Sequence, residues 1–421
     1  MGKKRHFAWW ILFSCWVLFF VGLGMLINCQ GLFFVPVCNE LGFTRAGINF
    51  YITIFCLALM VALPAAGYIF PRFNIKWILG IAMTIASLGF AAMGLFNHLY
   101  SWYVMAALRG VAYAFIFYMP VPLILNNWFV RKFGLAVGIA GTGSSIGGAI
   151  FSPLTSYVIS AYGWRNGYFF LGILGFLIIM PIILFLIYKP SDIGMHPYGY
   201  GSQPETQKVI VNKTIGIPSH TAIKTLPFYC LFFFAGLGQM SSYLNSQLPG
   251  YSSSLGLAPS VGAFMLSSTM IGLSFGKAFL GWLNDRFGVL KATFFTCTIG
   301  VLGMLGLLAG VHNVTLLYVG AGLFGMTMAI SSVEPPIITR AIFGTMDYSA
   351  IFAYITMGSC LFGGIGTFIY GYIYDMTGSF QWALILCIIS YLIAFILAVV
   401  AMQSRDAVLK KAALQGAGTH Q

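Results

Sequence analysis

The chain has 421 residues, of which 59% are hydrophobic and only 7% are charged, and its mean hydropathy is +0.91. These values lie far outside the range of a soluble domain. The formal net charge of +13 would suit a nucleic-acid partner, but the placement of the charges, described below, argues against one.

Apolar runs long enough to cross a bilayer follow one another along the chain. In hydrocarbon a backbone must satisfy its own hydrogen bonds, so spans are helices or closed barrels, and these runs are too long for strands. The first run follows Lys3, Lys4 and Arg5 without a small-residue cleavage pattern, which favours a retained helix over a signal peptide. The sequence predicts twelve spans, near 7–29, 46–70, 75–96, 100–127, 131–158, 165–188, 223–250, 259–284, 288–311, 313–343, 347–376 and 378–402.

The chain also repeats itself at half its length. Gly67 and Gly281 each open a short turn after an apolar run, and Leu41-Gly42 recurs as Leu255-Gly256, in both cases 214 residues later. Duplicated helical halves are how many secondary transporters build a central site that opens to alternate sides. The predicted fold class is therefore an all-α membrane protein with twelve transmembrane helices in two six-helix halves related by pseudo-twofold symmetry.

The predicted organisation is a first half over 1–188, a linker over 189–222, a second half over 223–402 and a tail over 403–421. The linker contains Pro, Gly, Ser and Lys, and we expect it to act purely as a tether.

The basic residues lie mainly on one side of the predicted spans. Seventeen of the 21 Lys and Arg residues fall at the termini or in even-numbered loops, which predicts that both termini and the linker are cytoplasmic. They are Lys3, Lys4, Arg5, Arg72, Lys76, Arg131, Lys132, Lys189, Lys208, Lys213, Lys224, Arg286, Lys291, Arg340, Arg405, Lys410 and Lys411. This asymmetry indicates a multi-pass protein of the plasma (inner) membrane.

The turn after the eighth predicted span reads GWLNDRFG over residues 281–288. Glycine lets two helices approach closely, and an acidic and a basic residue at the membrane face can pair with each other or with a helix end. This turn resembles the signature loop of the major facilitator superfamily. The resemblance implies that Gly281, Asp285 and Arg286 form a gating loop that does not contact substrate.

Two further stretches refine the resemblance. The first-half copy of the loop has Pro71 where the acidic residue should be, so a latch is expected from the second-half loop alone. Residues 127–136 read NWFVRKFGLA and run into a series of glycines three or four apart, then Pro153-Leu154 and residues 162–165 (YGWR). The order of these elements is similar to that in the monocarboxylate-porter and oxalate/formate-antiporter branch. Such glycines give a helix a flat face for close packing.

Four basic residues fall outside the cytoplasmic group: Arg45, Arg109, Arg165 and Lys277. Arg45 and Arg165 are expected near the outer surface, solvated or facing lipid. Arg109 and Lys277 lie at membrane depth, where an ionised group costs several kcal/mol and persists mainly beside a partner or a water-filled cavity. These two are the functional candidates.

Lys277 precedes Gly281 by four residues. In the family that the chain resembles, a cation at this place binds the substrate carboxylate, so Lys277 is the first choice for an anion-binding residue. The alternative is a lysine that snorkels towards the cytoplasmic face. Proton-coupled relatives carry an acid where this chain has Leu273, and oxalate exchangers carry a second lysine where it has Thr356, which favours a monoanion and makes Thr356 a second substrate contact.

Other polar groups interrupt the apolar spans. Arg109 has either a packing role or a role in substrate and proton coupling, and Tyr118 matches a position where exchangers of this branch place a substrate-lining tyrosine. Asn28 and Gln30 in the first span, and Asn245 in its repeat partner, are candidate cavity residues, although amides can instead join helices.

Two candidates exist for a coupled proton. Lys277 could serve as both carboxylate ligand and proton carrier. Glu334, before Pro335-Pro336, is the one acidic residue expected within a span, and its alternative role is to pair with Arg340 or a loop cation. The six histidines fall in predicted loops or termini, so a histidine relay is not expected.

The sequence thus predicts a secondary carrier of small organic monocarboxylates that works by proton symport or anion exchange. The rival reading is a proton-coupled carrier of drugs or other solutes with Glu334 as the proton site, and a third is a receptor with a transporter fold. No catalytic, metal or cofactor constellation is evident, so neither an enzyme nor a cofactor is expected. The expected partners are a small carboxylate substrate and the lipid bilayer, and no nucleic acid is expected. The chain is expected to be a monomer.

Overall fold

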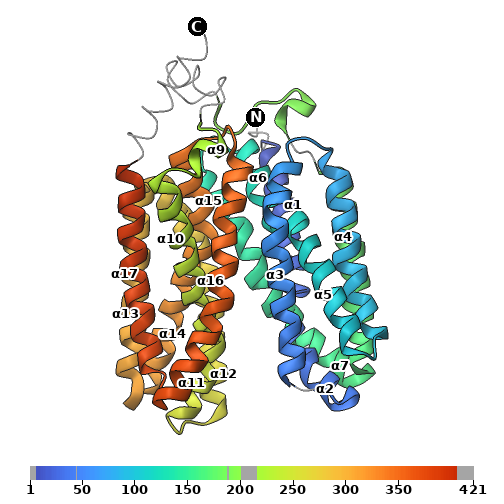
Figure 1. Cartoon of the computed structure of the whole chain (residues 1–421), viewed down its shortest axis with the longest axis vertical. Coiled ribbons are helices and arrows are strands. Elements are labelled where there is room, and N and C mark those ends of the chain that lie inside the picture. The colour runs from blue at the N-terminus through green and yellow to red at the C-terminus, as the bar shows by residue number, and fades with distance from the viewer. Residues whose placement is uncertain (1–5, 44, 187–188, 201–215, 405–421) are drawn as a thin grey trace, which may run out of the picture. The chain divides into compact units, whose positions relative to one another are not determined.

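A computed structural model describes residues 6–43, 45–186, 189–200 and 216–404. The chain forms two compact units, one from residues 1–131 and 139–198 and one from 132–138 and 199–421. In each unit the long helices run side by side (Figure 1). The domain boundaries expected from the sequence stay a prediction, and much of the linker and tail, with Lys208, Lys213, Arg405, Lys410 and Lys411, lies outside the described residues.

The first unit contains seven α-helical segments joined by short 3₁₀ and π segments in its described part. Within it α3 and α4 both pack against α5, and α1 contacts α6. The segments are α1 (Ala8–Phe19), η1 (Phe20–Met25), η2 (Gln30–Phe33), α2 (Phe34–Leu41), α3 (Arg45–Ile69), α4 (Ile75–Ala92), η3 (Met93–Leu95), α5 (Leu99–Tyr113), η4 (Ala114–Tyr118), α6 (Pro120–Trp128), α7 (Phe133–Phe185) and η5 (Pro190–Ile193).

The second unit repeats this plan. In it α10 packs against α16 and α17, while α12 and α13 both pack against α14. Its segments are α9 (Ser219–Ala222), α10 (Leu226–Tyr243), η7 (Leu244–Gln247), α11 (Leu248–Ser254), α12 (Pro259–Phe287), α13 (Val289–Ala309), η8 (Gly310–His312), α14 (Val314–Met328), α15 (Ile330–Phe343), α16 (Tyr348–Thr377) and α17 (Gln381–Gln403).

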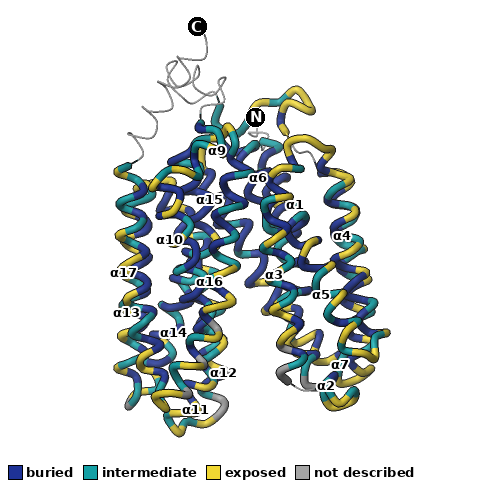
Figure 2. Tube along the Cα trace, viewed as in Figure 1, coloured by how far each residue is buried: buried dark blue, intermediate teal, exposed yellow. Residues whose placement is uncertain are grey.

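Large apolar side chains cover the outer faces of these helices. Trp77 is 74% exposed, Phe185 81% and Phe368 73%, and exposed positions recur along the long helices (Figure 2). A soluble monomer rarely exposes apolar surface on this scale, whereas hydrocarbon accepts it. Ten helical stretches among the described residues are long and apolar enough to cross a membrane.

Two of the predicted spans account for the difference between ten and twelve. The 53-residue α7 contains Gly163 with φ 82° and ψ 161°, a conformation that breaks it into two successive helices. The stretch from α10 through η7 to α11 is also of membrane length, but polar residues such as Gln239 and Ser242 lower its hydropathy. With these two corrections the helices match the twelve predicted spans in order.

The helix interruptions follow the sequence repeat. The 3₁₀ segment η2 begins at Gln30, and η7 begins 214 residues later at Leu244. The helices that follow are each succeeded within two residues by a glycine with positive φ, Gly42 (φ 68°) and Gly256 (φ 73°), and these glycines have the same separation. The duplication predicted from sequence therefore extends to the positions at which membrane helices are broken.

The described ends of the linker make ordered contacts that the sequence did not indicate, and the expectation that the linker is a tether stays a prediction. The Tyr198 amide donates to the Trp128 carbonyl at 2.8 Å, and the Tyr198 carbonyl accepts from Val130 at 3.1 Å. At the other end the Ile217 amide donates to the Phe343 carbonyl at 3.1 Å, and Asp347 accepts from the Ser219 amide at 2.8 Å. Each end thus bonds to its own unit, through backbone groups at both ends and also through the Asp347 carboxylate at the second.

Candidate functional site

Lys277 lies on α12 at a close helix crossing in the second unit. Its side chain is 6% exposed. A Cβ atom at Gly138, near the start of α7, would collide with the Lys277 carbonyl oxygen, and one at Gly134 would lie 2.7 Å from the Gly281 carbonyl oxygen. The backbones of α7 and α12 therefore touch, as glycine faces allow, and this contact fixes the backbone position from which Lys277 projects.

Asp285 caps the first turn of α7. Its carboxylate accepts the Gly134 amide at 3.0 Å and the Leu135 amide at 2.7 Å. Free amides and the positive end of the helix dipole make this position favourable for an anion. Of the pairings that the loop motif allows, Asp285 therefore makes the one with a helix end, while the Arg286 guanidinium lies 5.4 Å from the Trp282 ring centre.

A second residue also holds the start of α7. Arg340 on α15 places its guanidinium 4.4 Å from the centre of the Phe133 ring, a cation–π contact with the first residue of α7. Thus α12 and α15 both contact the first turn of this helix.

Glu334 on α15 is fully buried, and its hydrogen-bond partner is Asn284 instead of Arg340 or a loop cation. The Asn284 amide nitrogen donates to Glu334 Oε1 at 3.0 Å and to the Leu280 carbonyl at 2.9 Å. Glu334 Oε2 and Asn284 Oδ1 are buried without a hydrogen-bond partner. Buried polar atoms are normally satisfied, so this pair stands out chemically.

In the first unit Arg109 is fully buried among aromatic side chains. Its guanidinium donates to the Tyr51 hydroxyl and, at 3.2 Å, to the Tyr113 hydroxyl, and it lies 4.7 Å from the centre of the Phe90 ring. Gln30, 8% exposed, lies beside the Tyr51 hydroxyl. Gln30 and Arg109 thus both lie beside Tyr51, and Arg109 has no solvent-exposed surface there.

The remaining candidates lie at helix interruptions or on helix faces. Tyr118 ends the π segment η4 and is half-buried, and Asn245 lies in η7 with its Oδ1 buried and unpartnered. The Asn28 side chain donates to the Ser144 carbonyl at 3.0 Å. Thr356, 8% exposed, donates its hydroxyl proton to the Phe352 carbonyl at 2.8 Å.

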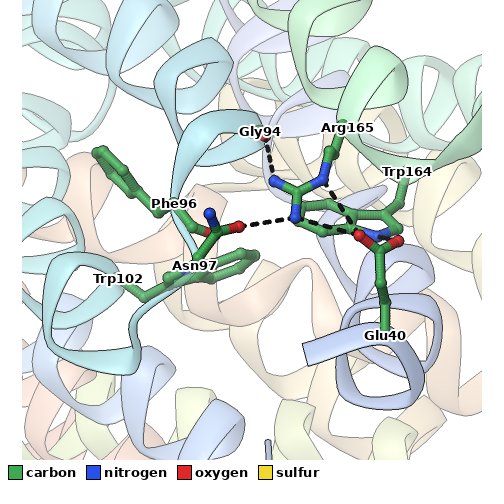
Figure 3. A network of polar contacts seen from close by, with 7 residues as sticks. All are labelled: Glu40, Gly94, Phe96, Asn97, Trp102, Trp164 and Arg165. Atoms are coloured by element: carbon green, nitrogen blue, oxygen red, sulfur yellow. Dashed lines mark hydrogen bonds and ion pairs between the residues drawn. The ribbon is translucent and has the colours of Figure 1, made fainter. Parts of the chain in front are cut away.

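Arg165, whose side chain is 34% exposed, also makes polar contacts that the sequence did not indicate. Its guanidinium pairs with Glu40 at 3.1 Å and donates to the Gly94 carbonyl at 2.9 Å and to Asn97 at 2.7 Å (Figure 3). Trp164 donates its indole proton to the same Glu40 carboxylate at 2.6 Å. The network joins α2, the η3–α5 connection and α7. The side chain of Arg45 lies outside the described part of the molecule.

Two neighbours of the candidate residues escaped the sequence reasoning. Asn284 is adjacent to Asp285 in the signature loop, and its helical spacing from buried Leu280 could have indicated that it points inwards. Tyr51 carried no such signal, because tyrosine is too frequent in this chain, at 22 residues, for one position to stand out.

Comparison with known proteins places this arrangement in a family. The model of the Major Facilitator Superfamily matches residues 12–243 and 228–419. An "Uncharacterized 38 kDa protein in 23S RNA operon" of Thermoproteus tenax is 26% identical over 345 residues, which cover 80% of this chain and 81% of that protein. "Monocarboxylate transporter 12" of Xenopus laevis is 23% identical over 401 residues, covering 90% and 85%.

The fold comparison agrees. The crystal structure of FucP, a Major Facilitator Superfamily transporter in the outward conformation, covers 93% of this chain and 97% of its own with a TM-score of 0.65 and 16% identity, which is evidence of the fold alone. The predicted twelve-helix fold class and the resemblance to the monocarboxylate-transporter branch are thereby confirmed. This chain belongs to the Major Facilitator Superfamily and is a multi-pass membrane transporter.

Proposed function

We propose that this transporter carries small organic monocarboxylates, of the lactate, pyruvate or formate kind, and that Lys277 is the cation that binds them. The observation that carries the proposal is a lysine 6% exposed within a membrane helix, four residues before the Gly281 crossing. A charge at this depth is costly and typically marks a substrate or ion pathway. Relatives named as monocarboxylate transporters support the same substrate class.

The proposed chemistry is recognition of one carboxylate by one ammonium. Lysine presents a compact charge with rotatable donors and does not impose the bidentate geometry of arginine. Asn245 supplies a further contact, because its buried Oδ1 is unpartnered and lies in the broken helix η7. Broken helices are where transporters of several folds bind substrate. Thr356 in the second unit is also a proposed substrate contact, and Tyr118 and Asn28 are the residues proposed to contact substrate from the first unit.

Arg109 and Gln30 have a different proposed role. Arg109 is fully buried and bonded to Tyr51 and Tyr113, so it organises the helices of its unit and does not touch substrate directly. Gln30, which lies beside Tyr51, is proposed to support the same packing. The gating loop of Gly281, Asp285 and Arg286 regulates helix contacts at the end of α12.

Transport in this proposal is secondary, by proton symport or anion exchange with alternating access. Lys277 or Glu334 carries the coupled proton in the symport case. The positive-inside distribution supports a protein of the plasma membrane with both termini in the cytoplasm, and we propose that it acts as a monomer.

Substitution of Lys277 tests the proposal. Lys277→Gln keeps much of the side-chain shape but removes the charge, so carboxylate uptake into proteoliposomes should fall by about 100-fold or more, as expected for loss of a buried charge pair. Lys277→Arg should retain part of the uptake. Lactate, pyruvate, formate and acetate should raise the melting temperature of the purified wild type but not of Lys277→Gln. Uptake at the wild-type rate by a folded Lys277→Gln protein would exclude this assignment.

A second candidate function rests on Glu334. A buried carboxyl with an unpartnered oxygen suits a proton-coupled carrier of neutral or cationic solutes, in which this carboxyl binds and releases the coupled proton. The two functions differ in one measurement. Glu334→Gln would abolish all transport in the second case, whereas a carboxylate carrier retains anion exchange.

A further inference from the structure

The Glu334–Asn284 pair has one hydrogen-bond donor too few when Glu334 is ionised. Both amide protons of Asn284 are donated, one to Glu334 Oε1 and one to the Leu280 carbonyl. The Thr293 hydroxyl lies beside the carboxylate, but its proton goes to the Val289 carbonyl at 2.9 Å. The two unpartnered atoms of the pair, Glu334 Oε2 and Asn284 Oδ1, are both acceptors when Glu334 is ionised.

One proton on Glu334 Oε2 removes this deficit. It turns an acceptor into a donor beside the acceptors of Asn284 and Thr293, and it removes a buried negative charge. An ionised carboxylate within a membrane helix costs several kcal/mol when no cation or set of donors compensates it. The arrangement in the structure is therefore that of a neutral acid bonded to an amide.

The charged residues on the helices packed against α15 do not bond to Glu334. The titratable group that faces it is Cys297 on α13. α10 and α14 carry no Asp, Glu, Lys, Arg or His within their bounds. The charged residues on α12, α13, α15 and α16 are Lys277, Asp285, Arg286, Lys291, Arg340 and Asp375.

The same pair connects the two elements that hold the start of α7. Asn284 immediately precedes Asp285, whose carboxylate caps Gly134 and Leu135. Glu334 shares α15 with Arg340, which lies over Phe133. The Glu334–Asn284 bond thus joins α12 to α15 one residue before Asp285 and six residues before Arg340.

We propose that Glu334 and Asn284 form a proton-binding site whose occupancy controls the Asp285 cap on α7. With the proton on Oε2 the pair is satisfied and the cap is in place. When the proton leaves to water, the buried carboxylate retains a single amide donor, from Asn284, and its charge is no longer compensated. Separation of α15 from α12, which lets water reach the carboxylate, then becomes favourable, and it releases the Asp285 cap. The role of this step in transport rests on the proposed function, but its structural test does not.

Hydrogen exchange of the full-length protein, without substrate, tests the proposal. The protection factor of the amides over residues 134–138 should fall by about tenfold or more between mildly acidic and mildly alkaline buffer in the wild type. Glu334→Gln supplies a permanent donor and acceptor, so the protection should stay high at every pH. Asp285→Asn removes the charged cap, so the protection should be low at every pH.

Glu40→Gln, which neutralises an exposed acid of the first unit, is the matched control and should keep the wild-type pH dependence at residues 134–138. Protection in the wild type that does not change with pH overturns the proposal, even if Glu334→Gln fails to assemble. Equal pH dependence in the wild type and Glu334→Gln overturns it as well. If Lys277→Gln transports carboxylates normally, the proposed function fails, but the hydrogen-exchange result at residues 134–138 still decides whether Glu334 and Asn284 form the proton-binding site.

Discussion

Arg109 shows how a cation can persist in a membrane helix without an acidic partner in contact. Two tyrosine hydroxyls accept its protons, and the faces of Phe90 and Tyr113 lie 4.7 and 5.5 Å from its guanidinium. Aromatic faces and hydroxyl oxygens together replace much of the hydration that the charge loses. This environment is internal to one unit, which is why a structural role fits it better than contact with a substrate.

Replacement of this arginine should reduce stability more than substrate affinity. Arg109→Gln loses about two hydrogen bonds from a charged donor, each worth about 1.5–3 kcal/mol, and leaves buried hydroxyls unsatisfied. Arg109→Lys should be intermediate, since one ammonium replaces a two-armed fork. Thermal unfolding in detergent and carboxylate binding by calorimetry measure the two effects. An Arg109→Gln protein with unchanged melting temperature and abolished binding would assign Arg109 to the substrate.

Thr356 bears on the charge of the substrate. Its hydroxyl is already committed to the Phe352 carbonyl, so it offers no positive charge to a second carboxylate. Thr356→Lys should therefore shift competition towards oxalate by about tenfold relative to lactate, provided that the new ammonium reaches the bound anion. Thr356→Val is the control without charge. The one-cation argument is incorrect if oxalate already competes better than every monocarboxylate against the wild type.

At the scale of elements, the crossing of α7 and α12 depends on missing side chains. Gly138→Ala places a methyl group against the Lys277 carbonyl, and Gly281→Ala does the same against Gly134, so each should force the helices apart and lower the melting temperature. Gly80→Ala on α4 is a matched control because nothing lies within 4 Å of the added atom, and better helix propensity should leave it neutral or slightly stabilised. Equal melting temperatures for all three variants would show that the crossing tolerates separation.

The sequence predicted the elements better than their contacts. Span positions follow from hydropathy, and the glycines at 134 and 138 predicted a close helix contact, because both signals are local in the chain. The partners of Arg165, by contrast, come from α2 and the η3–α5 connection, and no spacing in the sequence brings Glu40 and Asn97 together. Of the candidate site, Lys277 and Glu334 could be selected by charge at depth, but the bond to Asn284 required the packing of α12 on α15.

At the scale of the whole molecule, the two repeats have diverged where they need different chemistry. Asp285 caps α7, while its counterpart Pro71 has no carboxylate to offer. In the second unit Asp347, directly before α16, instead accepts the amide of Ser219 at the end of the linker. The start of α7 is therefore bonded by the Asp285 carboxylate. At the corresponding start of α16, the Asp347 carboxylate bonds the end of the linker instead.

Proton coupling provides the decisive measurement on the whole transporter. If one proton accompanies each anion, inward uptake should rise as external pH falls, because the proton is then a co-substrate whose concentration increases. Proton symport into the liposomes also raises the pH of the external medium. With the proton on Glu334, Glu334→Gln should lose both the pH dependence of uptake and this external pH rise, while anion exchange continues at a rate near that of the wild type. With the proton on Lys277 instead, Glu334→Gln should remain fully coupled. Recording pH on both sides of the membrane during lactate uptake by the wild type and by Glu334→Gln separates these outcomes. Wild-type uptake that is independent of pH would exclude both residues as proton carriers and leave exchange as the mode of transport.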